Sequence, residues 1–170
     1  MEDKILESIA YVLPAAVTGF VAYYMFNGFI NNKNEEKKLA ILAQRKKEAL
    51  PTKLQANERM LLFCDRINPV KMLMRIQPIS DNTQDYLQLL LANIEQEYEH
   101  NLVQQIYISD KTWMAILAAK NAVINKLRQV SESSNSANDL RENVLIDYSK
   151  STPPTETAID FIKSEVRALL

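Results

Sequence analysis

The sequence predicts an all-α protein, in which an N-terminal transmembrane helix continues into a charged stalk and then into a cytoplasmic bundle of four to six helices. Residues 9–30 contain no charged side chain, and apolar residues recur at helical spacing along most of the chain that follows. Both glycines, Gly19 and Gly28, lie inside the uncharged run. Phosphate-binding loops, dinucleotide fingerprints and nucleophile elbows all need glycine, so the sequence disfavours enzymes built on them.

The uncharged run has the length of a membrane span. As a helix, its 22 residues extend ~33 Å, about the thickness of a hydrocarbon core. A secretory signal peptide would have a basic start and a shorter apolar core, whereas the charged residues of 1–8 are mostly acidic. A buried helix of a soluble protein would be shorter. Aromatic side chains lie near both ends of the run, as in interfacial belts: Tyr11, Tyr23, Tyr24, Phe26 and Phe29.

Lysine and arginine are distributed unequally about the run, and this predicts an orientation. Only Lys4 precedes it, whereas basic residues cluster after it: Lys33, Lys37, Lys38, Arg45, Lys46 and Lys47. The positive-inside rule therefore predicts a single-pass membrane protein, with residues 1–8 outside and the C-terminal domain in the cytoplasm. The lone cysteine, Cys64, excludes an intramolecular disulfide and fits a reducing compartment.

Two small residues inside the predicted anchor raise the possibility of self-association. Ala15 and Gly19 have small-xxx-small spacing, which lets a second helix approach closely. Small residues are common in membrane helices, so a plain anchor is the favoured interpretation. A membrane-anchored oligomer that associates through this face is kept as an alternative.

The stalk, residues 31–50, is predicted to continue the anchor as one helix because it contains neither proline nor glycine. Its apolar seam is thin, which is typical of a solvated rod or a coiled-coil arm. Pro51 is expected to end this helix or to start the next one.

The cytoplasmic domain, residues 51–170, divides at prolines and capping residues. Asn82 and Ser109 are expected N-caps. The triplet Ile106-Tyr107-Ile108 is rich in strand-forming residues but too short to make a sheet. The predicted helices cover residues 52–67, a short segment from Pro69 to Met74, and residues 83–105, 110–131, 138–149 and 155–169.

The only histidine, His100, stands three residues after Glu97, which is the Glu-x-x-His spacing of carboxylate-bridged metal bundles. Such sites need a second motif of this kind, and one chain cannot supply it. A polar helix face is the favoured interpretation, and a metal or enzymatic site using Glu97, His100 and Cys64 is the alternative. Cys64 lies among apolar residues and is expected in the core. No metal, cofactor or small-molecule substrate is predicted.

The polar residues near the end of the predicted 83–105 helix are the candidate partner-binding surface. They are expected to lie close to one another and to Arg59 if the helices over 52–67 and 83–105 pack together: Arg59, Glu97, His100, Asn101, Gln104 and Gln105. The expected partners are the lipid bilayer and other membrane-complex proteins or copies of the chain. Nucleic acid is not expected, because acidic residues interrupt the basic segment and the pI is about 5.9.

Two stretches carry a resemblance to a known family. Residues 50–67 read LPTKLQANERMLLFCDRI, and residues 98–113 read YEHNLVQQIYISDKTW. With the uncharged run before them, the chain resembles an uncharacterised family of small single-anchor proteins of Bacteroidota. The resemblance implies no activity. It implies a recurring pattern that includes Glu58, Arg59, His100, Asn101, Gln104 and Gln105, and that Asn57 replaces an aromatic residue.

Overall fold

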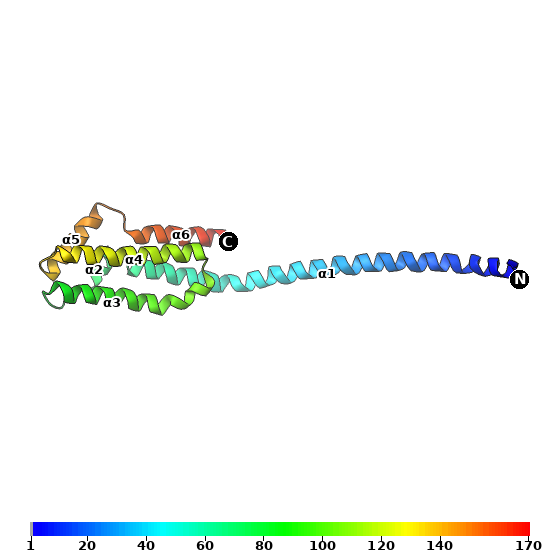
Figure 1. Cartoon of the computed structure of the whole chain (residues 1–170), viewed down its shortest axis with the longest axis horizontal. Helices are drawn as coiled ribbons and strands as arrows, with labels where there is room; N and C mark the ends of the chain where they lie inside the picture. The colour runs from blue at the N-terminus through cyan, green and yellow to red at the C-terminus, as the bar shows by residue number, and fades with distance from the viewer. Residues whose placement is uncertain (1) are drawn as a thin grey trace. The chain divides into compact units, whose positions relative to one another are not determined.

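The computed structural model describes the backbone of residues 2–170, and the side chains of Pro14, residues 17–30 and residues 33–170. Between residues 2 and 170 there are six α-helices, one 3-10 helix and no strand (Figure 1). The predicted all-α class is therefore confirmed. The chain separates into two compact units, Met1–Ala49 and Leu50–Leu170.

A single helix, α1 (Glu2–Arg66), passes through the boundary between the two units. The expectation that a helix ends or begins at Pro51 is wrong. Proline removes one backbone hydrogen bond and crowds the preceding turn. The residues on either side of Pro51, from Lys46 to Leu50 and from Lys53 to Ala56, are mostly strong helix formers, which offset this local defect.

The first unit has exposed side chains along its described length, residues 17–30 and 33–49. Over the residues whose side chains are described, no helix is both long and apolar enough to cross a membrane. Part of the predicted anchor, residues 9–13 with Ala15 and Ala16, lies outside the described side chains.

The second unit contains the remaining helices, and α4 occupies its centre. After α1 come α2 (Pro69–Arg75), α3 (Thr83–Asn101), the 3-10 helix η1 (Leu102–Tyr107), α4 (Asp110–Glu132), α5 (Ala137–Ser149) and α6 (Pro154–Leu169). Helix α4 packs against α3, α5 and α6. The buried apolar residues of the described chain all belong to this unit, from Ala56 to Ile162.

The expected N-caps are confirmed. The side chain of Asn82 accepts hydrogen bonds from the Gln84 and Asp85 N–H groups, and Ser109 accepts one from Thr112. Each cap satisfies amide groups that would otherwise lack a partner at the start of a helix.

The predicted helix over residues 83–105 is too long. Helix α3 ends at Asn101, where the side-chain Nδ2 donates to the Glu97 carbonyl oxygen at 2.8 Å. Side-chain bonds of this type compete with the backbone ladder. The chain then tightens into η1, whose residues include the β-branched Val103 and Ile106.

Candidate interaction surface

One end of the second unit gathers residues from three elements. Ser109, between η1 and α4, donates its backbone N–H to Glu165 Oε1 of α6 at 3.0 Å and its hydroxyl to Oε2 at 2.6 Å. Lys53 of α1 is close enough to Glu165 to lower the pKa of that carboxyl electrostatically. We call this the η1 end, because η1 ends at Tyr107, two residues before Ser109.

Glu97, one of the candidate surface residues, forms an ion pair within the second unit. Its two carboxylate oxygens accept hydrogen bonds from Arg66 Nη1 at 2.9 and 3.0 Å. Glu97 is largely buried and Arg66 is exposed. The arginine of α1 that bonds to α3 is therefore Arg66, and Glu97 is engaged within the protein.

Arg59 lies on the same side of α1 as Arg66, because seven residues complete about two helical turns. Arg66 contacts Glu97, and the Phe63 ring lies 6.2 Å from the Tyr98 ring, so α1 and α3 run antiparallel. This register places Arg59 opposite the start of η1. Arg59 is exposed, and no ion pair forms with it among the described residues.

The other candidate surface residues differ in how far their side chains are exposed to solvent. Asn101 is half-buried and its amide is used to end α3, and Gln104 is half-buried in η1. His100 and Gln105 are exposed. Of the predicted surface, the side chains of Arg59, His100 and Gln105 therefore face solvent and form no side-chain bond among the described residues.

Sequence reasoning missed the most exposed part of this surface. Four apolar side chains of η1 face solvent: Leu102 at 43%, Val103 at 63%, Ile106 at 75% and Tyr107 at 39%. None of the six residues of η1 is buried. The available signal was the run of apolar residues around Ile106 and Tyr107, which fits no helical stripe, although Ile108 at its end is buried.

The Glu165 carboxylate fixes Ser109, the N-cap of α4, against α6. Burial by itself would raise the pKa of the Glu165 carboxyl. Hydrogen bonds from the Ser109 and Thr112 side chains and from the Ser109 N–H, together with the nearby charge of Lys53, stabilise the carboxylate more strongly. The pKa is therefore lowered from its ordinary value of 4.5. The charged carboxylate also lies at the N-terminus of α4, where the helix dipole favours a negative charge.

A buried cation connects α3 and α4 farther inside the unit. Lys120 Nζ lies 2.6 Å from Glu95 Oε2 and 3.9 Å from the centroid of the Tyr98 ring. The side chain of Lys120 is 10% exposed and that of Glu95 is 50% exposed. The centroid of the Tyr98 ring also lies 6.1 Å from that of the Trp113 ring, so the ammonium group of Lys120 lies beside a pair of aromatic rings.

Cys64 is a core residue, as expected. It is fully buried, and desolvation raises its thiol pKa to about 12. A thiol of this pKa is protonated at neutral pH and is a poor nucleophile. Among the described residues, no group of three or more His, Cys, Asp or Glu side chains is arranged to hold a metal ion.

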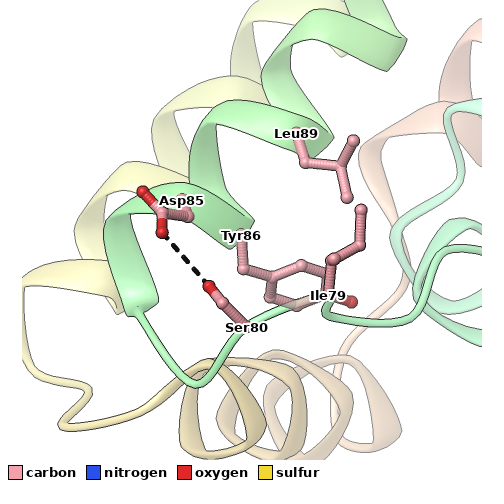
Figure 2. A pocket seen from close by; sticks show the side chains of 5 residues that line it. All are labelled: Ile79, Ser80, Asp85, Tyr86 and Leu89. Carbon is pink, nitrogen blue, oxygen red and sulfur yellow. Dashed lines mark hydrogen bonds between the residues drawn. The ribbon is translucent and has the colours of Figure 1, made fainter.

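Two hollows lie elsewhere on the second unit. A cavity of about 340 Å³ opens between the loop before α3 and α3 itself, lined by Ile79, Ser80, Asp85, Tyr86 and Leu89 (Figure 2). Figure 2 shows Ile79 and Leu89 above the Tyr86 ring, while Ser80 donates to Asp85 at 3.1 Å. A shallower, mainly apolar groove runs between α4 and α6, past Met114, Ala118, Ala122 and Phe161.

The relation of this chain to known proteins rests on a family model. No curated protein and no solved structure matches the chain. The family model matches residues 3–169, which is nearly the whole chain and includes both units. The protein therefore belongs to the family of unknown function DUF7935.

Proposed function

We propose that this protein is a membrane-tethered interaction module, an accessory or scaffolding subunit of a larger complex in a bacterial inner membrane. Residues 9–30 are the tether, residues 1–8 lie outside and the second unit lies in the cytoplasm. The second unit acts through contacts with other membrane-complex proteins, and Arg59, His100 and Gln105 contribute to its contact surface.

The observation that carries the proposal is the exposure of apolar side chains along residues 17–30. They include Val21 at 50%, Phe20 at 66%, and Tyr23 and Phe26 at 67%. In an α-helix these positions are spread around the axis, so no single neighbour covers them. Apolar side chains in such a continuous stretch require a non-aqueous environment or a partner.

The chemistry at the end of the stretch supports a bilayer as that environment. Lys33 Nζ lies 4.7 Å from the centroid of the Phe29 ring. Aromatic rings and lysines with long aliphatic stems are enriched where a helix leaves the hydrocarbon core. The basic residues that follow, from Lys37 to Lys47, fit the cytoplasmic side.

Fractionation of cells that express the tagged full chain tests the tether. We expect the protein in the membrane fraction after washes with carbonate and high salt, and its release by detergent. A variant with Phe20→Lys and Val21→Lys is the test, and Leu39→Lys with Leu42→Lys in the stalk is the matched control. Recovery of the unaltered chain in the supernatant would contradict the proposal.

The interaction role is tested by gentle solubilisation and purification of the tagged chain. We expect stoichiometric partner proteins, lost from an Arg59→Ala, Gln105→Ala double variant that still folds. Purification of a monomer alone would contradict the role as a scaffold.

Self-association through the anchor is the second candidate. A Cβ atom added at Gly19 would meet no atom within 4 Å, so this helix face is unoccupied. Ala15, its predicted companion, lies outside the described side chains.

The metal alternative at Glu97 and His100 stays a prediction. Arg66 already engages both carboxylate oxygens of Glu97, so a metal would have to displace it. Metal analysis of the purified chain, with His100→Ala as the control, tests this alternative directly.

A further inference from the structure

We propose that the cavity beside the start of α3 is a second contact site of this protein, and that it takes a lysine or arginine side chain of a partner protein. The inference rests on the interaction role proposed above and involves neither the tether nor the first unit. It begins with Ile79, which lines the cavity and is 90% exposed, more than any other large apolar side chain among the described residues.

The cavity has the size and lining of a pocket for one side chain. Its volume of about 340 Å³ lies at the lower end of the range for ligand pockets, roughly 300–1,000 Å³. Three of its five lining residues are apolar or aromatic: Ile79, Tyr86 and Leu89. The Tyr86 side chain is 1% exposed and forms the floor. An aliphatic stem therefore fits this lining better than a large cofactor does.

A carboxylate lies at the opposite edge of the cavity. Figure 2 shows Asp85 and Ser80 on one side of the Tyr86 ring. Ile79 and Leu89 lie on its other side. The Ser80 hydroxyl donates to Asp85 Oδ2 at 3.1 Å, and no basic side chain pairs with Asp85 among the described residues. A lysine or arginine matches this pattern, because its stem packs on apolar surface while its charged end reaches an anion.

The surroundings of the cavity are acidic, which favours a cationic partner. The Ala137 N–H bonds to the Asp81 carbonyl at 3.0 Å, so the start of α5 lies beside the loop that precedes α3. Residues 78–85 and 128–142 carry two arginines, Arg128 and Arg141, against five carboxylates: Asp81, Asp85, Glu132, Asp139 and Glu142. Their net charge of −3 attracts a basic segment and repels an acidic one.

The arginines nearest the cavity are engaged elsewhere. Arg141 lies near Tyr86, but its Nε donates to the Leu73 carbonyl at 3.1 Å. The Nη2 of Arg75 donates to Asn93 Oδ1 at 3.2 Å. These bonds hold both guanidinium groups within the second unit, so Asp85 is left for a cation from outside.

The bonds of the loop before α3 hold the cavity in shape. The Tyr86 hydroxyl donates to the Ile76 carbonyl at 2.7 Å, which fixes the floor to the start of the loop. The Asn82 side chain caps α3 and fixes the end of the loop. A preformed pocket loses little conformational entropy when a side chain enters it.

Titration of the full chain in detergent micelles tests the proposal. The isoleucine δ1-methyl groups are labelled with carbon-13, and an Ile79→Val variant identifies the Ile79 signal. The first probe is a capped tripeptide with lysine between two alanines. The second probe has norleucine in place of lysine, which keeps the stem and removes the charge. Pentylammonium chloride is the third probe and represents a free amine.

We expect the lysine peptide to shift the Ile79 signal in a saturable manner and the norleucine peptide to bind about fivefold more weakly, the effect of one partly solvated ion pair. Asp85→Asn should lower the affinity for the lysine peptide to that for the norleucine peptide. Asp110→Asn is the matched control, because Asp110 is an exposed carboxylate in the first turn of α4, as Asp85 is in α3. The Ile146 methyl group, 51% exposed on α5, should not shift.

Three results of the titration would overturn the inference. Absence of a saturable shift at Ile79 would eliminate the site. Equal binding of the lysine and norleucine peptides would assign the cavity to an apolar side chain. Tighter binding of pentylammonium than of the lysine peptide would assign it to a free amine. The methyl signals of buried Ile94 and Ile116 check that each variant folds.

Purification after gentle solubilisation separates this inference from the proposed function. Asp85→Asn should reduce the yield of a partner that Asp110→Asn retains, and equal yields would overturn the inference while leaving the interaction role intact. Recovery of a monomer alone from the unaltered chain would instead contradict the interaction role, together with the assignment of the cavity to a partner protein.

Discussion

Glu165 and Ser109 are separated by 56 residues in sequence, yet the carboxylate of one receives two hydrogen bonds from the other, at 3.0 and 2.6 Å. The last helix of the chain thereby caps the first turn of the central helix. This contact closes the η1 end of the bundle, and its charge makes it sensitive to pH.

Glu165→Gln should lower the free energy of unfolding by about 1 kcal/mol at pH 7, because charged hydrogen bonds are replaced by neutral ones in a partly solvated site. The folded-state pKa of Glu165 lies below the ordinary 4.5, so the carboxylate stabilises the protein fully above that pH. The contribution is lost as the pH falls through the lowered pKa. Urea denaturation between pH 7 and pH 3 measures the difference, which should shrink toward zero.

Asp160→Asn on the same helix is the control, because its carboxylate is exposed and lies 3.9 Å from Lys163. An equal pH dependence in both variants would assign the effect to overall charge rather than to the contact with Ser109.

Asn57→Leu should stabilise the protein. The Asn57 side chain is fully buried, and its Oδ1 has no hydrogen-bond partner. Its Nδ2 bonds only to the Lys53 carbonyl one turn earlier. An unsatisfied buried oxygen costs about 1–3 kcal/mol, so leucine, which is similar in size, should raise stability by about 1 kcal/mol. Thermal unfolding measures this gain, with Asn121→Leu on the surface of α4 as the control. A loss of stability would mean that Oδ1 has a partner, such as a bound water.

The Lys120–Glu95 pair should respond asymmetrically to mutation. Glu95→Gln leaves the buried ammonium group of Lys120 without its counter-charge, and should cost about 1–2 kcal/mol. Lys120→Met removes the buried charge itself and should change stability by less than about 1 kcal/mol. Denaturant titration of both single variants and the double variant gives the coupling energy. Equal losses from the two single variants would show that the pair acts as a simple surface salt bridge.

Gly19→Leu distinguishes a plain anchor from a self-associating one. A Cβ atom added at Gly19 or at Gly28 would meet no atom within 4 Å, so leucine fits at both positions in a single chain. If Ala15 and Gly19 form a helix contact, crosslinking in the membrane should fall several-fold for Gly19→Leu and remain unchanged for Gly28→Leu. Equal crosslinking in all three proteins would favour the plain anchor.

The helical content and the caps followed from the sequence because their causes are local. Asn82 and Ser109 cap helices through amides two or three residues away, so the pattern alone identified them. The end of α3 was harder to predict, since Asn101 stops the helix only by competing with the backbone at Glu97. At Pro51 the prediction was wrong because proline is a strong local signal for a helix boundary, yet the helix formers on either side of it keep α1 continuous.

The contacts of the candidate surface residues could not be predicted from the sequence. Arg59 and Arg66 occupy equivalent positions two turns apart, and the axial register between α1 and α3 decides which one meets Glu97. No pattern within either helix encodes that register. The exposure of Val103 and Ile106 was likewise missed, because it depends on where the bundle ends in space.

The continuity of α1 has a mechanical consequence. The helix that crosses Pro51 also contributes Ala56, Met60 and Phe63 to the buried core. A pull applied to residues before Leu50 therefore acts on a helix that contributes to the buried core, rather than on a frayed end or a loop. Tension along α1 would therefore act directly on the packing of the bundle.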